Sequence, residues 1–165
     1  MIAGIDLAGI ESRPTGLCIL NTEVYLHTVY TDTEILTILN QNNIALAALD
    51  APLSFRGEHF RDGDRELRAH FPILPLTFRG MQSLTQRGIR LKNSLSCKVI
   101  EVYPHAAKKI LGIVRMEDVT SYGIDVIPSN LHELDAAVAA LTGEFYLQGR
   151  YTAYGTQDMI IVPRF

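Results

Sequence analysis

Four carboxylates stand at the ends of, or inside, the most apolar segments of this chain. Three apolar runs, MIAGIDLAG, IALAALDAP and KVIEVYP, each carry one acid near the end of the run, namely Asp6, Asp50 and Glu101. The fourth, Asp135, lies within the apolar stretch LHELDAAVAAL. Acids are almost never fully buried without a partner, so these four are either isolated capping residues or the parts of one constructed site.

The three runs are short and apolar, as is typical of buried strands. Because the carboxyl ends of parallel strands open into one crevice, where α/β proteins bind ligands, we expect these acids to converge there. Asp6 shares its strand face with Gly4 and Ala8, whose small size leaves space above the carboxylate. The alternatives are structural: Asp6 bonding loop amides, Asp50 capping a turn, and Glu101 in an ion pair.

Asp135 falls within the apolar stripe of a predicted helix. The stripe consists of Leu131, Leu134, Val138 and Leu141. A charged side chain there needs a partner, and no Lys or Arg occurs in this helix before Arg150, which favours a functional site over a buried salt bridge. His132, about one turn earlier, could orient Asp135 or a water, or simply cap the helix start.

Convergence of these acids would require a cation. Two ionised carboxylates about 4 Å apart repel each other by roughly 4 kcal/mol at an effective dielectric constant near 20. Several such pairs would rival the ~5 to 15 kcal/mol by which a whole domain is stable. Converging acids must therefore share protons or hold a metal, and oxygen ligands favour Mg²⁺ or Mn²⁺ over zinc, with two sites possible.

A segment of positive charge lies in the middle of the chain, although the net charge is -3. Between Leu67 and Ile100 there is no Asp or Glu, whereas six basic residues lie there: Arg68, Arg79, Arg87, Arg90, Lys92 and Lys98. Arginine suits bidentate phosphate contacts, so this segment is a candidate for binding nucleic acid; a solvated helix face is the alternative. The candidate phosphate-positioning residues are Arg13, Arg79, Arg87 and Arg90.

The elements that would position these residues begin with an antiparallel meander. A chain of 165 residues with 47% hydrophobic content predicts one globular domain over residues 1–165. Its first third predicts strands at 1–8, 16–20 and 23–31. A short helix starting at 32–34 then leads into a strand at 44–50, and this helical crossover implies parallel pairing with the first strand.

The remaining elements alternate helix and strand. We expect short helices at 61–71 and 81–95, the second weakened at Gly88, and a Pro-broken loop between them. A fifth strand at 97–103 precedes a short helix that ends at Gly112. The strongest helix spans 130–149, and two short strand-like pieces, YTAYG and MIIVP, follow it.

The sequence predicts a cytoplasmic protein with reduced thiols. It has neither a basic leader nor a cleavable apolar stretch at its start, and no run of membrane-spanning length, so no membrane association is expected. Cys18 and Cys97 lie singly in separate strand-like runs, which fits neither a metal motif nor a disulfide framework.

The order of these motifs resembles the ribonuclease H-like fold, and specifically the family known as domain of unknown function 429, described as predicted nucleases. The resemblance covers nearly the whole chain and is carried by GIDLAG, TGLCIL, ALDAPLSF, FRDGDRELR, GMQSLTQRG, VIEVYPHAA, HELDAAVAAL and MIIVP. It implies an α/β fold with a mixed five-stranded sheet in the order 3-2-1-4-5, helices on both faces and a short C-terminal strand pair. It also implies that Asp6, Asp50 and Asp135 are metal-binding acids.

The fourth acid departs from the pattern of many ribonuclease H enzymes, in which it comes from the first helix. Glu34 is the only acid within that helix of this chain, at its start, so Glu101 is our substitute as a ligand.

The predicted function is a metal-dependent phosphodiesterase acting on DNA or RNA. Asp6 would bridge two ions and Asp50 and Asp135 would each complete one, so that one metal activates water and the other stabilises the leaving oxygen. One alternative is a phosphate or nucleotide enzyme of the actin-like and sugar-kinase superfamily. The segments GIDLAG and TGLC also resemble the first strand and hairpin of that superfamily. Another is a non-catalytic protein that keeps the fold and binds nucleic acid or another partner. No Lys-Ser or Lys-Thr follows GIDLAG, which excludes a P-loop.

Overall fold

The apolar runs of the sequence form the middle of one sheet. The computed structural model describes all residues from 1 to 165. The strands are β1 (Ile2–Asp6), β2 (Thr15–Leu20), β3 (Val24–Val29), β4 (Leu46–Asp50), β5 (Lys98–Val102), β6 (Tyr151–Tyr154) and β7 (Ile160–Pro163). Their order is β3-β2-β1-β4-β5-β7-β6. Strands β1, β4, β5 and β7 run parallel, and the other three are antiparallel to their neighbours.

The predicted strand order 3-2-1-4-5 is confirmed, and the C-terminal pair extends it. Strand β7 lies parallel to β5, with Glu101 paired to Ile160, and β6 forms the edge of the sheet. The sheet therefore has seven strands where five and a short pair were expected.

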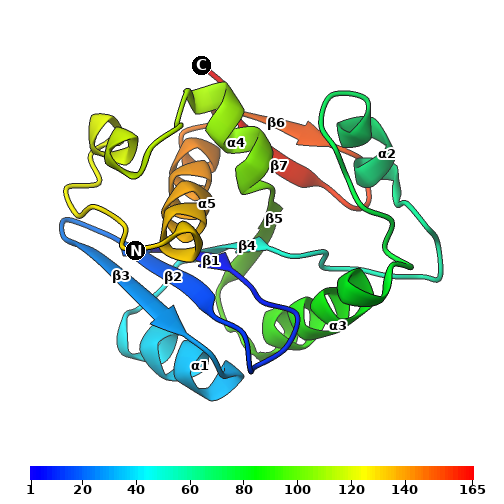
Figure 1. The fold of residues 1–165 in the computed structure, drawn as a ribbon, viewed down its shortest axis with the longest axis horizontal. Helices are drawn as coiled ribbons and strands as arrows, with labels where there is room; N and C mark the ends of the chain where they lie inside the picture. The colour runs from blue at the N-terminus through cyan, green and yellow to red at the C-terminus, as the bar shows by residue number, and fades with distance from the viewer.

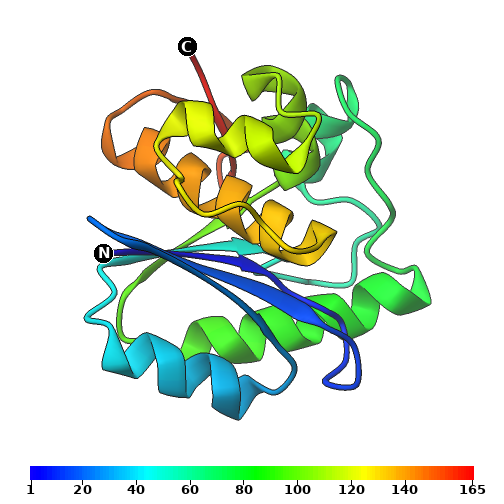
Figure 2. The same ribbon diagram turned by 60° about the vertical axis from the view of Figure 1, so that its left-hand side comes forward.

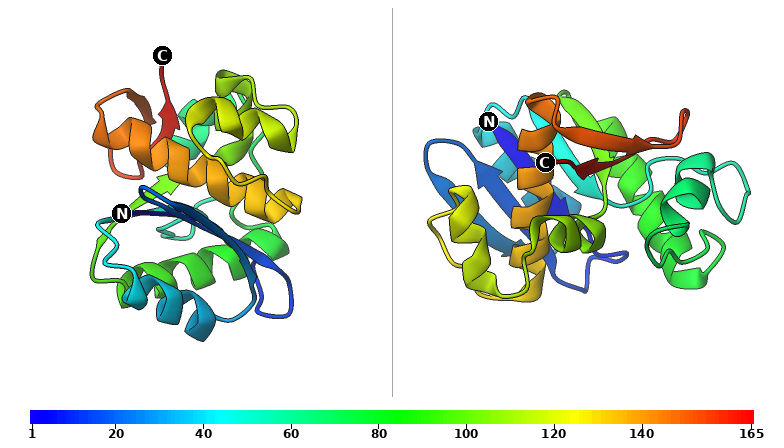
Figure 3. Two further views of the ribbon diagram at one scale, coloured as in Figure 1. Left: turned by 90° about the vertical axis from the view of Figure 1, so that its left-hand side faces the viewer. Right: turned by 90° about the horizontal axis from the view of Figure 1, so that it is seen from above.

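The helices cover both faces of this sheet (Figures 1 and 2). They are α1 (Asp32–Gln41), α2 (Asp62–Arg68), α3 (Arg79–Ser94), α4 (Pro104–Leu111), the 3-10 helix η1 (Met116–Tyr122) and α5 (Leu131–Leu147). Helices α1 and α3 lie on one face, and α5, with α4 and η1 beside it, lies on the other (Figure 3, left). None of the helices has the length and apolar character needed to cross a bilayer.

The sequence pattern predicted the start of α1 and the end of α4 correctly. Thr31 and Glu34 form a reciprocal capping box at the start of α1, and Gly112 ends α4 in the left-handed conformation with φ of 68°. Helix η1 was not predicted. Both cysteines are free, and burial raises the pKa of the Cys18 thiol to about 12, consistent with the predicted reduced thiol.

Gly88 does not weaken α3, contrary to the sequence-based expectation, because the helix runs unbroken from Arg79 to Ser94. A Cβ at this position would lie 2.9 Å from Ala51 Cβ and 3.0 Å from Pro52 O. The missing side chain therefore lets α3 pack closely beneath the segment that follows β4.

Glycines on the opposite face allow α5 to rest directly on the central strands. A Cβ at Gly4 would lie 2.1 Å from Ala136 O, and one at Gly16 would lie 1.9 Å from His132 O. Backbone therefore meets backbone at β1 and β2, with only the small side chains of the alanine-rich helix between the layers. This contact fixes the first turns of α5 above the carboxyl end of β1.

We predict that Gly4→Ala destabilises the protein by about 3 kcal/mol or more, because the added methyl group meets the α5 backbone and not a movable side chain. Urea unfolding measures the change. Gly112→Ala is the matched control: it has open space around its Cβ and a φ of 68°, so it should cost only about 1 to 2 kcal/mol. Equal losses for the two variants would contradict the close packing of α5.

Candidate functional site

Asp6 and Asp50 end adjacent parallel strands on the face that α5 covers. The register pairs Asp6 with Asp50 directly. The alternation of strand side chains puts both acids on the same face as Gly4 and Ala48, which contact α5 at Ala136 and Gly143. Both predicted positions are therefore correct: the two acids lie together at the carboxyl edge of the sheet.

Helix α5 brings two more side chains to this edge. His132 Nδ1 lies 2.8 Å from Asp6 Oδ2. Asp135 lies three residues further along α5, and its charge acts on both Asp6 and Asp50. The helix start is capped by Asn130, whose Oδ1 accepts a hydrogen bond from the Glu133 N–H, so His132 is free to face the sheet. The sequence suggested that His132 orients Asp135 or a water; it contacts Asp6 instead.

Burial and neighbouring acids raise the pKa values of Asp6 and Asp50. Burial is the main cause that raises the pKa of Asp6, and the neighbouring Asp135 adds to it, while the hydrogen bond with His132 opposes it. The pKa of Asp50 is raised well above its usual value, again first by burial and then by the charges of Asp6 and Asp135. The carboxylates thus form one electrostatic cluster.

Two of the acids have a basic partner and the third does not. Lys108 of α4 places its Nζ 2.5 Å from Asp135 Oδ1, an oxygen that is buried and receives no well-directed hydrogen bond. Asp6 has His132. Asp50 forms neither an ion pair nor a hydrogen bond; the charge of Glu101 also raises its pKa, and only the charge of Lys108 lowers it. The salt bridge that the sequence disfavoured at Asp135 is therefore present, because its basic partner lies on α4 and not on the helix that carries the acid.

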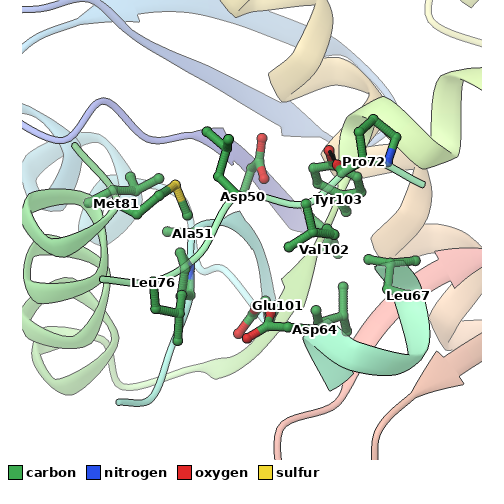
Figure 4. Close-up of a pocket in the computed structure, with 15 residues that line it drawn as sticks. Asp50, Ala51, Asp64, Leu67, Pro72, Leu76, Met81, Glu101, Val102 and Tyr103 are labelled. Carbon is green, nitrogen blue, oxygen red and sulfur yellow. Dashed lines mark hydrogen bonds between the residues drawn. The ribbon is translucent and has the colours of Figure 1, made fainter. Parts of the chain in front are cut away.

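Glu101 does not belong to this cluster, which corrects its assignment as a metal ligand. It is paired with Leu49 in the parallel register and therefore lies on the face of the sheet opposite Asp50. Figure 4 shows the two carboxylates pointing in different directions. Arg61 donates to both oxygens of Glu101, at 2.9 and 2.5 Å, and the Leu53 N–H donates at 2.9 Å. The structural ion pair, the alternative for this residue, is what the structure contains.

Arg61 holds a second acid in the same buried cluster. It donates from its backbone, Nε and Nη2 to Asp64, while only 1% of the arginine side chain is exposed. The cluster of Arg61, Asp64 and Glu101 ties α2 to β5 and, through Leu53, to the segment after Asp50. This cluster was not predicted, because nothing in the local sequence distinguishes a buried arginine from an exposed one.

Arg87 is the second correction, since it cannot contact a phosphate as predicted. Its side chain is 1% exposed, and it donates to Asp32 Oδ1 at 2.7 Å, to Ala8 O at 2.8 Å and to Tyr30 O at 2.6 Å. It joins α3 to the loop after β1 and to the start of α1. Its role is structural.

The other candidate arginines are exposed. Arg13 lies in the turn between β1 and β2, Arg79 begins α3, and Arg90 lies three turns along that helix. Arg79 is near the carboxyl edge of the sheet, since Met81 lines a pocket together with Asp50. Helix α3 leads away from this edge, which puts Arg90 about 16 Å further along the helix axis.

Comparison with known proteins gives the fold a context. Two solved structures of RuvC from Thermus thermophilus are similar to this chain. One is a complex with a Holliday junction substrate, with a TM-score of 0.59 and 16% identity over 90% of this chain and 94% of that chain. The other has a TM-score of 0.54 and 14% identity over 90% and 95%. No family model and no curated protein matches the chain.

This similarity confirms the ribonuclease H-like fold that the order of motifs implied. The narrower resemblance, to domain of unknown function 429, is not confirmed, because no family model matches.

The electrostatics of Asp50 predict a distinctive pH dependence of stability. An unfolded Asp has a pKa of about 4, and the folded value is higher, so the native state binds the proton more tightly. The contribution of this group therefore stabilises the fold at low pH and is lost as the pH rises through the folded pKa. In chelator, Asp50→Asn should be more stable than the wild type at neutral pH, by roughly 1 to 3 kcal/mol, and this difference should shrink towards pH 4.

Urea unfolding between pH 4 and 8 measures this difference. Asp125→Asn is the matched control, because Asp125 is exposed. If the difference in unfolding free energy between wild type and Asp50→Asn did not change with pH, the pKa of Asp50 would not be raised in the folded protein.

The corrected role of Arg87 also makes a prediction. Arg87→Met should lower the free energy of unfolding by about 2 to 4 kcal/mol, because Asp32 and two backbone carbonyls lose their donors. Arg90→Ala on the exposed side of the same helix should change it by less than about 0.5 kcal/mol. Thermal or urea unfolding tests this, and two equally mild substitutions would contradict the buried network.

Proposed function

We propose that this protein is a divalent-metal-dependent nuclease, with Asp6, Asp50 and Asp135 as its metal-binding acids. The observation that carries the proposal is that Asp50, which forms no ion pair or hydrogen bond, lies beside Asp6 at the carboxyl edge of adjacent parallel strands, where burial and neighbouring acids raise its pKa well above the usual value. A folded protein keeps such a cluster at a cost in stability, and perturbed carboxylates of this kind are concentrated at functional sites. The similarity to RuvC in complex with a Holliday junction supports nucleic acid as the substrate class.

The donor atoms of the cluster suit magnesium or manganese. Asp6, Asp50 and Asp135 would supply the oxygen ligands that these ions prefer, and His132 Nδ1 lies 2.8 Å from Asp6 Oδ2 as the partner of that acid. Asp135 Oδ1 lies 2.5 Å from Lys108 Nζ, so a metal bound at this oxygen would replace or share the contact with the lysine. No three of these side chains form a ready-made cage. The approach of the acids to within metal-bridging reach, with Asp6 shared by two ions, therefore stays a prediction.

When bound, the metal would activate water and stabilise charge on the phosphate. The residues of the chain have separate tasks. Lys108 and His132 hold Asp135 and Asp6 in position before an ion arrives. Arg79 and Arg13 are the exposed cations proposed to contact backbone phosphates. Arg90 lies further from the acids and would contact a more distant part of the substrate.

The proposal predicts that Asp6→Asn, Asp50→Asn and Asp135→Asn each reduce cleavage of nucleic acid by at least about 100-fold while the fold is kept. The assay uses labelled four-way DNA junctions, single-stranded DNA, duplex DNA and RNA with Mg²⁺ or Mn²⁺. Each variant should also lose the metal-dependent rise in melting temperature that we expect for the wild type. Asp125→Asn, in an exposed loop, is the control that should keep both properties.

Two outcomes would favour the other functions that the sequence left open. Tight binding of nucleic acid with no cleavage in either metal would favour a non-catalytic binding protein. Binding of a free nucleotide, unchanged by the asparagine substitutions, would favour the phosphate or nucleotide enzyme.

A further inference from the structure

A pocket of about 220 Å³ opens beside Asp50 at the carboxyl ends of β4 and β5 (Figure 4). Ten of its fifteen lining residues are hydrophobic, so its surface is mostly apolar. Its walls come from α2, α3, β7 and the chain segment 72–76. Because Asp50 lines it, the pocket and the acid cluster share one residue.

The inner walls of this pocket are buried, and its rim is exposed to solvent. Leu67, Leu76 and Val102 are at most 2% exposed, which shows that the inner walls are part of the packed core. Leu74 at the rim is 57% exposed. The Tyr103 hydroxyl donates to Pro72 O at 2.6 Å and so fixes an aromatic ring in the wall beside that rim. Such a preformed apolar hollow with few polar groups is typical of small-ligand sites, and its volume is below that of drug-sized pockets.

The polar groups of the pocket are hydrogen-bond acceptors. Asp64 and Glu101 line it, and both are held by Arg61, which with the Leu53 N–H fixes their carboxylate oxygens in place. Asp50 provides a third carboxylate nearest to the acid cluster. A ligand that fits is therefore small, apolar over most of its surface, and a hydrogen-bond donor where it meets the carboxylates.

We infer that this pocket receives one unpaired nucleobase that carries an amino group, next to the phosphate at the acid cluster. The inference rests on the proposed nuclease function and names the part of the substrate that the site recognises. Adenine, cytosine and guanine have exocyclic amino donors for the acceptors of the pocket, whereas thymine and uracil have no amino group and offer only the ring N3–H as a donor. Enzymes that act on nucleic acid commonly accept an unstacked base in such a pocket, by stacking on its face and bonding to its edge.

The surroundings match this occupant. A base is joined to its phosphate through a single sugar, and Asp50 lies both in the pocket wall and in the acid cluster, so one nucleotide can reach both. Arg79 is exposed two residues before Met81, a wall residue, and supplies positive charge for the adjoining backbone. A base held in a duplex cannot enter, which makes unpaired positions the preferred sites.

The test measures binding of labelled DNA hairpins in chelator, where cleavage does not interfere. The hairpins are identical except for one position, which is fully paired or carries a single unpaired adenine, cytosine or thymine. The wild type should bind the adenine and cytosine bulges about tenfold more tightly than the paired hairpin, and the thymine bulge with a smaller gain. A 2-aminopurine at the bulge should change its fluorescence on binding.

Two variants fill or charge the pocket, and one matched control does neither. Met81→Trp places a larger side chain in the wall, and Leu74→Asp adds a negative charge at the exposed rim, so both should remove the gain for unpaired bases. Ile89→Trp makes a comparable change on α3 but lines a different hollow, and it should keep the gain. Circular dichroism confirms that each variant is folded.

Equal affinity of the wild type for all four hairpins would overturn the inference, as would a gain that survives both pocket variants or is lost in Ile89→Trp. The experiments distinguish loss of the base preference from loss of nuclease activity. If metal-dependent cleavage is lost in the asparagine variants and no base preference exists, the nuclease stands without the base pocket. If the preference exists and no cleavage occurs, the pocket stands in a binding protein.

Discussion

The contact between the backbone of α5 and the glycines of β1 and β2 is the constraint on which the candidate site depends. With no side chain at Gly4 or Gly16, the helix lies so close to the sheet that carbonyl groups of Ala136 and His132 occupy the space of the missing Cβ atoms. The helix start is thereby fixed above the last residue of β1. A helix held further away could not place His132 within hydrogen-bond distance of Asp6.

This packing brings charges together that the fold balances only in part. Lys108 and His132 offset Asp135 and Asp6, while Asp50 stays without a partner. On the other face of the sheet, one residue away in register, Arg61 forms ion pairs with both Glu101 and Asp64. The contrast between the two faces is informative. The ion-paired acids have a structural role, whereas Asp50, which has no ion pair, is the acid on which the proposed metal site rests.

The sequence predicted the positions that depend on local pattern, and it failed where long side chains reach across the fold. The apolar runs located Asp6 and Asp50, and the parallel pairing implied by the helical crossover brought them side by side. Glu101 looked equivalent, because it also stands near the end of an apolar run. Its true surroundings depend on the strand register, since an offset of one residue reverses the face. No pattern in a single sequence determines that offset.

The basic segment illustrates the same limit. Its charges suggested one phosphate-binding surface, yet Arg87 is buried and bonded to three groups that are more than fifty residues away in sequence, while Arg79 and Arg90 are exposed on the same helix. Gly88 was expected to weaken that helix and instead lets it approach Ala51. Helix periodicity predicted where α3 lies, but the partner of each residue is a property of the packed structure.

Anomalous diffraction from a crystal soaked in Mn²⁺ tests whether the three acids bind a metal, because it locates the ion without relying on any assumed substrate. We predict an anomalous peak within coordination distance of the carboxylates of Asp6, Asp50 and Asp135, and its absence in a crystal of the Asp50→Asn variant. A wild-type crystal with no peak at these carboxylates, or with its peak only at other acids such as Asp64 and Glu101, would contradict it.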